Sequence, residues 1–278
     1  MSSVAPHKSL TRAVIVGVSG RMGQALLRAA PAFPQLIITG AIGSPGSLAL
    51  GRDAGEVAGI GSANLRITSD LPAALNEADV ALDFSTATAA AGTLAACRAA
   101  RKPLLLGTTG YQGQLDAALD AAAREVALLV APNTSLGVAL LSELTRIAAR
   151  ALPASFDVDV LELHHRLKQD APSGTALSLA RVAAEARGVP APGGTGTPRC
   201  SAGPRREGDI GLASLRAGDI VGEHTVLFCG AGEELVLTHR ARDRSVFARG
   251  ALSAALWLSS RAPGRYSMRD FIFAKTDA

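Results

Sequence analysis

Short apolar runs alternate with helix-like stretches through the first half of the chain. Five runs rich in Val, Ile and Leu are nearly continuous, at residues 12–17, 36–41, 80–84, 103–107 and 126–131. Strands buried on both faces of a parallel sheet have this pattern. Helical stretches lie between them, at 24–30, 88–101 and 114–124. This alternation predicts a doubly wound α/β sheet.

The pattern changes after Asn133. Two helices are predicted at 137–150 and 174–187, an alternating strand at 156–164, two β-rich segments at 219–229 and 234–238, and a final apolar helix at 247–259. Gly230, Ala231 and Gly232 suit an antiparallel hairpin between the β-rich segments. The loop 188–208, rich in Gly and Pro, is long enough to be either mobile or functional. We therefore expect an α+β domain with an open mixed sheet at 135–244, and a first domain of 1–134 completed by 245–278.

Composition narrows the class of protein. Of 278 residues, 48 % are hydrophobic, and 28 Lys and Arg against 24 Asp and Glu give a net charge of +4. Such an apolar chain is not disordered. No apolar run reaches the about 18 residues that span a bilayer, so no membrane is expected as a partner. The small positive excess does not indicate nucleic acid.

The cysteines and the first residues suggest the compartment. Cys97, Cys200 and Cys229 are far apart and form no C-x-x-C motif. The first ten residues lack the apolar stretch of a secretory signal, and we expect them to form a frayed tail. Three reduced thiols in the cytoplasm are the favoured interpretation, and a catalytic cysteine is the less favoured one.

A glycine-rich turn follows the first predicted strand and opens the first helix. Its sequence is Gly17-Val-Ser-Gly20-Arg-Met-Gly23, with Ser19 where the usual dinucleotide fingerprint has its second glycine. Glycines let the backbone approach a pyrophosphate, and the helix N-terminus adds amides and positive potential. Arg21 is placed to reach a phosphate or to lie in solvent. The alternative is a turn that only packs a helix on a strand.

The second strand ends without the acidic residue that usually binds the ribose of NAD. Residues 41–46 read Ala-Ile-Gly-Ser-Pro-Gly, with no Asp or Glu. Ser44 and nearby amides can then accept a 2′-phosphate, although no Arg stands beside Ser44. The prediction is that NADPH and NADH are both used, with NADPH at least as good.

Three later strand ends are expected at the same crevice. They are 83–85, which includes Phe84, the Gly-Thr-Thr-Gly of 107–110, and the Ala-Pro-Asn-Thr of 131–134. Small side chains, hydroxyls and amides suit a nicotinamide. Ordinary strand-to-helix turns also favour Gly and Thr, and this alternative stays open.

The stretch 162–175, Glu-Leu-His-His-Arg-Leu-Lys-Gln-Asp-Ala-Pro-Ser-Gly-Thr, carries most of the candidate chemistry. His164, His165, Arg166 and Lys168 place several donors within five residues. The helix that follows begins with free amides at Gly174 and Thr175, which make an anion site. A cationic cluster before a helix N-terminus suits a small dicarboxylate. Lys168 can pair with a carboxylate or donate a proton, and a neighbouring histidine can act as acid or base near neutral pH.

Other interpretations of these residues, without a catalytic role, remain open. Paired histidines are often a surface strand end. Zinc needs further ligands in register, and His7, His224 and His239 offer none nearby in sequence, so no metal is expected. Ser173 lacks the G-x-S-x-G motif of a serine hydrolase. Arg205 and Arg206 are expected to be a solvated loop pair rather than an anion site.

The chain resembles the 4-hydroxy-tetrahydrodipicolinate (dihydrodipicolinate) reductase family from about Arg12 to Asp270. The motifs that carry the resemblance are VGVSGRMG at 16–23, GTTG at 107–110, ELHHRLKQDAPSGTA at 162–176, LRAGDIVGEHTV at 215–226 and ALWL at 255–258. The string His-His-x-x-Lys-x-Asp-Ala-Pro-Ser-Gly-Thr is the most specific of them.

The resemblance implies hydride transfer from NAD(P)H to a cyclic conjugated imine with two carboxylates, giving tetrahydrodipicolinate for lysine and diaminopimelate biosynthesis. It assigns His164 as proton donor and acceptor and Lys168 as second proton donor. Substrate contacts are expected at His165, Ser173, Gly174, Thr175 and Thr109. Cofactor contacts are expected at Gly17, Val18, Ser19, Gly20, Arg21, Met22, Ser44, Phe84, Gly107, Thr108, Thr109, Ala131, Pro132, Asn133, Thr134 and Arg244.

The resemblance also implies a homotetramer associated through the open sheet of the second domain, and domain closure on binding. Two positions depart from the family pattern. Gly43 stands where many members carry the ribose acid, and Ser85-Thr-Ala-Thr follows Phe84 where many carry Pro and Glu. Two rival functions stay open: a reductase of another small dicarboxylate, and a non-catalytic NAD(P)-sensing module, which would not need two proton donors.

Overall fold

The computed structural model describes residues 10–111, 113–192, 205 and 208–274, and it divides into two compact units. Unit 1 comprises Met1–Leu136 and Ser245–Ala278, and unit 2 comprises Gly137–Arg244. The predicted boundaries were 134 and 245. The expected N-terminal tail, most of the loop 188–208, Cys200 and Arg206 lie outside the described residues.

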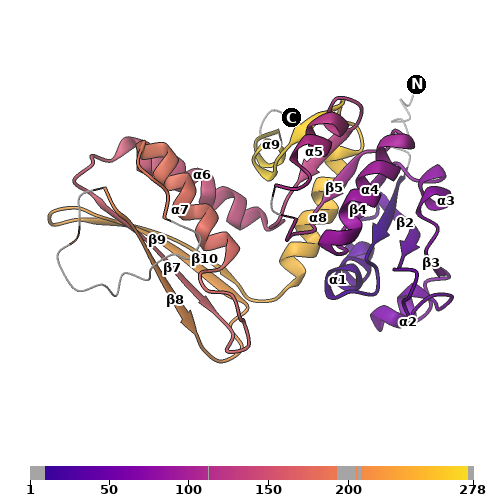
Figure 1. Ribbon diagram of the computed structural model, residues 1–278. Helices are drawn as coiled ribbons and strands as arrows, with labels where there is room; N and C mark the ends of the chain where they lie inside the picture. Colours follow the sequence, from indigo (N-terminus) through magenta and orange to yellow (C-terminus); the bar gives the residue numbers. More distant parts are fainter. Residues whose placement is uncertain (1–9, 112, 193–204, 206–207, 275–278) are drawn as a thin grey trace, which may run out of the picture. The chain divides into compact units, whose positions relative to one another are not determined.

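Unit 1 is built on a seven-stranded sheet with the order β11-β6-β5-β4-β1-β2-β3 (Figure 1). All neighbouring strands are parallel, as predicted. The strands are β1 (Thr11–Val16), β2 (Leu36–Ile42), β3 (Ile67–Thr68), β4 (Val80–Asp83), β5 (Leu104–Leu106), β6 (Ala127–Val130) and β11 (Gly264–Tyr266).

Helices cover both faces of this sheet (Figure 1). Val14 and Val16 belong to one apolar cluster with α3, α4 and α5, while Ile15, which is fully buried, points to the other face. There α8 packs on α1, β4 and β5, although it follows β1 by more than 200 residues. The unit 1 helices are α1 (Arg21–Ala29), the 3₁₀ turn η1 (Ala30–Ala32), α2 (Ala54–Ala58), α3 (Leu71–Asn76), α4 (Ala87–Ala99), α5 (Asp116–Ala123), α8 (Ser245–Leu258) and α9 (Met268–Ala274).

The order of strands creates a switch point beside β1. The chain proceeds from β1 to β2 and β3 on one side, then returns to place β4 on the other side. The connections that follow β1 and β4 therefore leave the sheet in opposite directions. Doubly wound sheets bind ligands at the carboxyl ends of the strands at such a point.

Unit 2 holds a four-stranded mixed sheet with the order β10-β9-β7-β8. Strands β7 and β8 are parallel, and β9 is antiparallel to both β7 and β10. Helices α6 and α7 pack on one face, around Val158, Val160, Val226 and Phe228 (Figure 1). The elements are α6 (Leu136–Ala151), β7 (Asp157–His164), α7 (Gly174–Arg187), β8 (Ile210–Arg216), β9 (Gly222–Cys229) and β10 (Glu234–Ala241).

The opposite face of the unit 2 sheet carries partly exposed side chains. Leu163 of β7 and Leu215 of β8 are paired on this face, and Leu215 is 58 % exposed. The inward and outward positions of β7 and β9 alternate as expected for a sheet covered on one side. The predicted hairpin between β9 and β10 is present.

Several short elements were not predicted from the sequence. These are α2, β3, α3, β8, β11, α9 and η1, all of them seven residues or shorter. Strand β8 reads Ile-Gly-Leu-Ala-Ser-Leu-Arg, with few β-branched residues, and its position depends on pairing with β7. Local sequence contains too little information to place such segments.

Arg205 corrects another expectation, because it is not a solvated loop residue. Its Nη1 donates to Asp159 Oδ2 at 2.6 Å and its Nη2 to the carbonyl of Val158 at 2.7 Å. Its side chain is only 16 % exposed. Arg205 therefore fastens the segment before β8 to β7.

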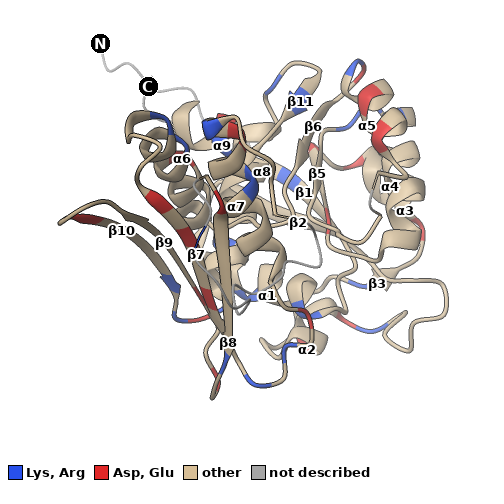
Figure 2. Ribbon diagram, turned by 60° about the vertical axis from the view of Figure 1, so that its left-hand side comes forward, with Lys and Arg blue, Asp and Glu red and all other residues tan. Residues whose placement is uncertain are grey.

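Charged residues of both signs are scattered over the helices and strands (Figure 2). Among the helices that the structure describes, none combines the length and the apolar character needed to cross a membrane.

Candidate active site

The helix-covered face of the unit 2 sheet changes from apolar to polar at one end. Along β7 the inward positions are Val158, Val160, Glu162 and His164. Because β8 and β9 are in register with β7, the same end receives Ser214 and Arg216 from β8, and His224 and Gly222 from β9. The sheet thus gathers ionisable side chains from three strands beside the start of α7.

Glu162 lies at the centre of this group and is completely buried. Arg216 binds it in a bidentate pair, with Nη1 3.0 Å from Oε2 and Nη2 2.8 Å from Oε1. Oε2 is also hydrogen-bonded to Nδ1 of His164, and Oε1 accepts from the amide of Ser173 at 3.2 Å. Arg216 Nη2 further donates to the carbonyl of Asp170 at 2.6 Å. One carboxylate therefore joins the predicted proton donor, β8 and the residue before α7.

These contacts determine the charge of Glu162. Burial alone raises the pKa of this carboxyl, but hydrogen bonds from His164, Arg216 and Ser214 outweigh burial and lower it to about 2. Glu162 is therefore ionised at every pH at which the protein is expected to work.

His164 is held on both sides of its ring. Nδ1 is bonded to Glu162, and a Cβ added at Gly222 would lie 3.1 Å from Nε2. The ring of His224 meets that of His164 edge to face, with centroids 5.2 Å apart and an interplanar angle of 74°. The His164 side chain is 11 % exposed, so Nδ1 is committed to the protein while the ring keeps some access to solvent.

His224 is a neutral imidazole inside the cluster. Its pKa is lowered to about 4 by burial and then by the nearby His164, against an opposing effect of Glu162. Nε2 of His224 lies 3.2 Å from the hydroxyl of Ser173. Ser173 Oγ in turn accepts from the amide of Ala176 at 3.2 Å and so caps α7.

The predicted anion site lies at the start of α7. Ser173 is the N-cap, and Gly174 is the first helical residue. Nothing would lie within 4 Å of a Cβ added at Gly174, so the space above this turn is open. The first-turn amides of a helix have no partners within the helix, and its dipole favours an anion there.

Lys168 and His165 follow β7 in the connection to α7. Lys168 Nζ lies 2.9 Å from both carboxylate oxygens of Asp170, and its side chain is 22 % exposed. Arg244 Nη2 lies 3.3 Å from Nε2 of His165. The sequence predicted Arg244 near the cofactor, and within unit 2 the structure places it on a substrate-side histidine.

In unit 1 the glycine-rich turn has the tight geometry that a dinucleotide needs. Gly17 has φ +82°, and a Cβ there would lie 2.7 Å from the carbonyl oxygen of Phe84. A Cβ at Gly23 would lie 2.4 Å from the carbonyl oxygen of Gly17. Gly20 is the N-cap of α1 and supplies no capping side chain, so the first-turn amides remain for a ligand.

The ends of β4 and β5 interlock beside this turn. A Cβ at Gly107 would lie 2.1 Å from Cε1 of Phe84, so the ring occupies the space that only glycine leaves. Asp83 is fully buried; its Oδ1 accepts from the amide of Ser85 at 2.8 Å and from the Thr108 hydroxyl at 3.0 Å. Asp83 Oδ2 has no hydrogen-bond partner within the described residues. The Thr108 hydroxyl is thus used in the hydrogen bond to Asp83, which leaves the backbone of Thr108 for contacts with a cofactor.

The end of β2 shows no acid available for a ribose. Gly43 is buried, and a Cβ there would lie 3.1 Å from Ile67, whereas Ser44 is exposed. The first acid after the strand, Asp53, accepts hydrogen bonds from the amides of Gly55, Glu56, Ala63 and Leu65. These bonds, the one from Ala63 first, lower its pKa to about 2. Asp53 is therefore committed to its own loop.

The last predicted cofactor segment, 131–134, follows β6. Thr134 is buried, and its hydroxyl donates to the carbonyl of Phe247 at 2.7 Å, which fastens β6 to α8. The Asn133 side chain accepts from the amide of Ser135 at 2.9 Å. Thr109 is exposed at the end of β5. The predicted cofactor residues therefore lie in unit 1 except Arg244, and the predicted substrate residues lie in unit 2 except Thr109.

Four residues of these sites were not assigned a role from the sequence: Glu162, Arg216, His224 and Asp83. Glu162 could have been found, because residues i and i+2 of a strand share a face and His164 follows it at that spacing. Arg216 and His224 are 52 and 60 residues from His164, and only the strand register brings them together.

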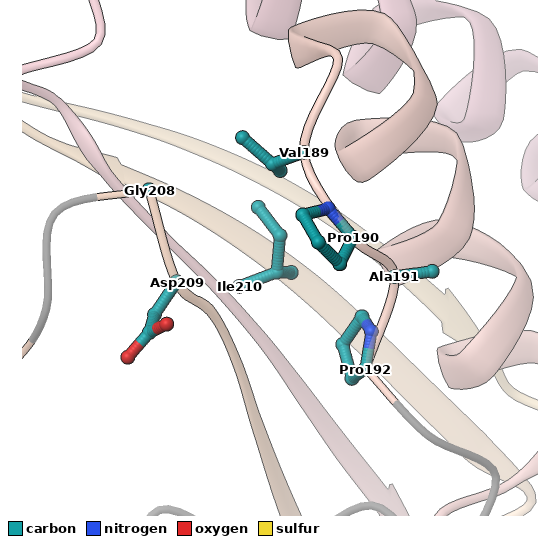
Figure 3. A pocket seen from close by; sticks show the side chains of 7 residues that line it. All are labelled: Val189, Pro190, Ala191, Pro192, Gly208, Asp209 and Ile210. Carbon is teal, nitrogen blue, oxygen red and sulfur yellow. The ribbon is translucent and has the colours of Figure 1, made fainter.

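A pocket in unit 2 lies at the opposite end of β8 from this cluster. Its lining comprises Val189, Pro190, Ala191, Pro192, Gly208, Asp209 and Ile210 (Figure 3). Ile210 pairs with Val158, and Arg216 pairs with His164 at the other end of the same strands. The six residue steps of β8 from Ile210 to Arg216 span about 20 Å, so the pocket is separate from the cluster. In the described part of the chain, no three His, Cys, Asp or Glu residues are placed to hold a metal ion.

The residues of unit 1 fit a dinucleotide: the turn accepts no side chains, the first-turn amides of α1 are uncapped, and the switch point lies beside them. Together with the acid–base cluster of unit 2, this defines a two-domain, dinucleotide-dependent oxidoreductase. Family models described as "Dihydrodipicolinate reductase, N-terminus" and "Dihydrodipicolinate reductase, C-terminus" match residues 11–134 and 137–272. The chain belongs to the dihydrodipicolinate reductase family.

Curated relatives agree with this assignment. The 4-hydroxy-tetrahydrodipicolinate reductase of Alkalilimnicola ehrlichii is 47 % identical over 269 residues, which cover 94 % of this chain and 98 % of the relative. That of Chelativorans sp. is 48 % identical over 261 residues, covering 93 % and 94 %. A solved dipicolinate-bound dihydrodipicolinate reductase from Paenisporosarcina sp. TG-14 has a TM-score of 0.74 and 24 % identity, covers 93 % of this chain and 97 % of its own, and supports the fold.

Proposed function

We propose that the protein catalyses the NAD(P)H-dependent reduction of 4-hydroxy-tetrahydrodipicolinate, through dihydrodipicolinate, to tetrahydrodipicolinate. The observation that carries the proposal is the cluster in which Glu162 holds His164 beside the capped start of α7. A module that only senses NAD(P) needs the glycine-rich turn but not a buried acid–base apparatus. The activity of the relatives, which align over more than nine tenths of the chain, agrees with the same reaction.

Reduction of a conjugated imine requires a hydride, which NAD(P)H supplies when bound, and a proton from an acid. His164 is suited to give the proton, because Glu162 occupies its Nδ1 and leaves Nε2 for exchange. Lys168 is the second acid, and Asp170 keeps its ammonium in place at 2.9 Å. A positioned acid of this kind contributes about 10²–10⁴ in rate.

The two carboxylates of the substrate require donors near these acids. Gly174 and Thr175 offer the first-turn amides of α7, with Ser173 as the cap and His165 as a further polar contact. Thr109, from the end of β5, is proposed as a contact from unit 1. Charge complementarity with Lys168 and Arg166 favours a dianion over a neutral ligand.

The cofactor is held, in this proposal, by backbone more than by side chains. Residues 17–22 cradle the diphosphate at the start of α1, and 107–109 and 131–134 border the nicotinamide. Ser44 is placed at the ribose, where no carboxylate repels a 2′-phosphate, because Asp53 is committed to its own loop. NADPH is therefore expected to serve at least as well as NADH.

A homotetramer is proposed to form through the uncovered face of the unit 2 sheet. Leu215 and Val236 on its strands are 58 % and 47 % exposed, which is unfavourable for a monomer. A cytoplasmic location fits Cys97 and Cys229, which are free thiols, and the need for reduced nicotinamide. Size-exclusion chromatography with light scattering tests the assembly, and the mass of a monomer would contradict it.

The test of the activity couples the purified protein to the aldol-forming synthase that makes its substrate. We expect loss of nicotinamide absorbance that depends on both enzymes, with kcat/KM for NADPH at least equal to that for NADH. A preference for NADH above about tenfold, or 1.4 kcal/mol, contradicts the cofactor assignment. Absence of turnover with either cofactor contradicts the proposed function itself.

A further inference from the structure

A completely buried carboxylate needs a reason to remain charged. Taking Glu162 out of water is costly, and the structure offsets that cost with donors from four residues. Two contacts come from Arg216, one from Nδ1 of His164, one from the amide of Ser173 and one from the side chain of Ser214 on β8. The burial of Glu162 is therefore tied to three separate segments: β8, the end of β7 and the start of α7.

A purely structural ion pair would need only part of this arrangement. The bidentate contact with Arg216 already neutralises the charge and uses both oxygens. The carboxylate nevertheless takes further donors, and two of them belong to the proposed acid, His164, and to the cap of the proposed carboxylate site, Ser173. The second set of contacts links the two halves of the proposed chemistry.

We propose that Glu162 is a positioning residue for the proposed reaction: it holds the proton of His164 on Nδ1, so that Nε2 exchanges protons with the substrate, and it fixes Ser173 in register with that imidazole. The inference rests on the proposed function, because it assigns the groups that orient the acid of that reaction. Arg216 has the supporting role of keeping Glu162 in place and ionised.

The proton balance of the step is simple. Protonated His164 gives the Nε2 proton to the substrate as hydride arrives, and the neutral ring that remains keeps its proton on Nδ1. Glu162 stays ionised and gains or loses no proton. Solvent then returns the Nε2 proton, so the carboxylate orients the imidazole and stabilises its cationic form without becoming an acid itself.

Other groups face the same imidazole and must be separated from Glu162 in any test. His224 from β9 meets the ring edge to face, Arg216 comes from β8, and Lys168 with Asp170 comes from the connection after β7. These groups are unchanged in a Glu162→Gln variant, which keeps the size of the side chain and removes its charge. The variant also places an amide donor where Nδ1 of His164 needs an acceptor.

The experiment measures the tautomer of His164 by nitrogen NMR in the full-length protein, wild type and Glu162→Gln. In the wild type we expect neutral His164 to carry its proton on Nδ1, and in the variant to shift substantially toward the Nε2-protonated form. The same variant is expected to lose about 30-fold in kcat, less than the about 10²–10⁴-fold that a positioned acid contributes, because His164 itself remains.

The matched control is Glu143→Gln on α6. Glu143 is also a buried carboxylate of unit 2 with an arginine partner, Arg146, at 3.1 Å. We expect this change to cost stability while leaving the His164 tautomer and kcat unchanged. Glu162→Asp, which keeps the charge on a shorter side chain, is expected to recover the wild-type tautomer and part of kcat, even if Glu162→Gln folds poorly.

Two results overturn the proposal. One is an unchanged tautomer of His164 in folded Glu162→Gln, and the other is a loss of kcat shared equally by Glu143→Gln. Failure of the proposed function is a different observation, since it is the absence of turnover in the wild type. The tautomer measurement needs no turnover, so it tests the role of Glu162 independently of the proposed function.

Discussion

Ser173 Oγ lies 3.2 Å from Nε2 of His224, so the residue that caps α7 is itself held by a buried imidazole. Replacing Ser173 with Ala removes the hydroxyl that accepts from the amide of Ala176 and that contacts His224. We expect a loss of about 1 kcal/mol in stability from the cap. Because α7 begins at the proposed carboxylate site, KM for the substrate should rise about tenfold, with NADPH affinity unchanged. Steady-state kinetics and nicotinamide fluorescence measure the two effects.

The N-cap of α3 in unit 1 provides a control that separates the effect on stability from the effect on substrate binding. Asp70 caps α3 by accepting from the amide of Ala73 at 3.0 Å. Asp70→Ala should cost a similar amount of stability and leave KM for the substrate unchanged. An equal rise in KM in both variants would mean that the effect of Ser173→Ala is general destabilisation.

Lys168 is predicted to be the second acid. Lys168→Ala should lower kcat by at least about a hundredfold, the usual scale for a positioned acid. Lys102→Ala, which removes a partly exposed lysine of unit 1, is the control and should keep normal turnover. Near-normal kcat in Lys168→Ala would refute the role.

The sequence predicted the parallel sheet because buried parallel strands leave a strong local signal. Runs such as 12–17 and 126–131 are apolar throughout, and glycines follow the first of them at once. The structure places β1 and β6 within one or two residues of these runs. Helix α7 was predicted with its observed bounds, because Ser173 and Gly188 mark its two ends.

The sequence predicted only those members of the proposed proton-donor cluster that lie in one segment of the chain. His164, His165 and Lys168 share a stretch of five residues, so their proximity can be inferred directly from the sequence. Arg216 and His224 reach His164 through the pairing of β8 and β9 with β7, and β8 itself was not predicted. Register depends on tertiary packing, which local patterns do not encode.

Gly107 is predicted to be essential for the cofactor site. A Cβ there would lie 2.1 Å from Cε1 of Phe84, so Gly107→Ala must displace the ring or the turn after β5. We expect NADPH affinity to fall at least about tenfold, which is 1.4 kcal/mol, as measured by nicotinamide fluorescence. Gly92 on α4 is the control, since nothing lies within 4 Å of a Cβ there. Gly92→Ala should stabilise the helix by about 1 kcal/mol and leave affinity unchanged.

His224 predicts how stability depends on pH. Burial lowers its pKa to about 4, so the unfolded chain binds this proton first and stability is lost as pH falls from about 6.5 to 4. The shift corresponds to about 3 kcal/mol as an order of magnitude. His224→Gln should flatten the unfolding free energy in this window, measured by urea denaturation at several pH values. His239, whose pKa burial also lowers, keeps part of the slope.

Glu162 predicts a second loss of folding stability, at lower pH than the loss assigned to His224. Its pKa is lowered to about 2, so its contribution is present above about pH 4.5 and is lost as pH falls toward 2. His224→Gln should therefore still lose stability below about pH 4.5. A variant with the wild-type slope between pH 6.5 and 4.5 would contradict the assignment of that window to His224.

The most direct test of the central claim follows the hydride itself. The coupled reaction is run with NADPH deuterated at both C4 positions, and the product is examined by mass spectrometry. We predict tetrahydrodipicolinate that carries one deuterium per molecule, formed by the wild type and strongly reduced in Lys168→Ala. NADPH oxidation that leaves the product unlabelled would contradict the assignment of this protein as a reductase of that substrate.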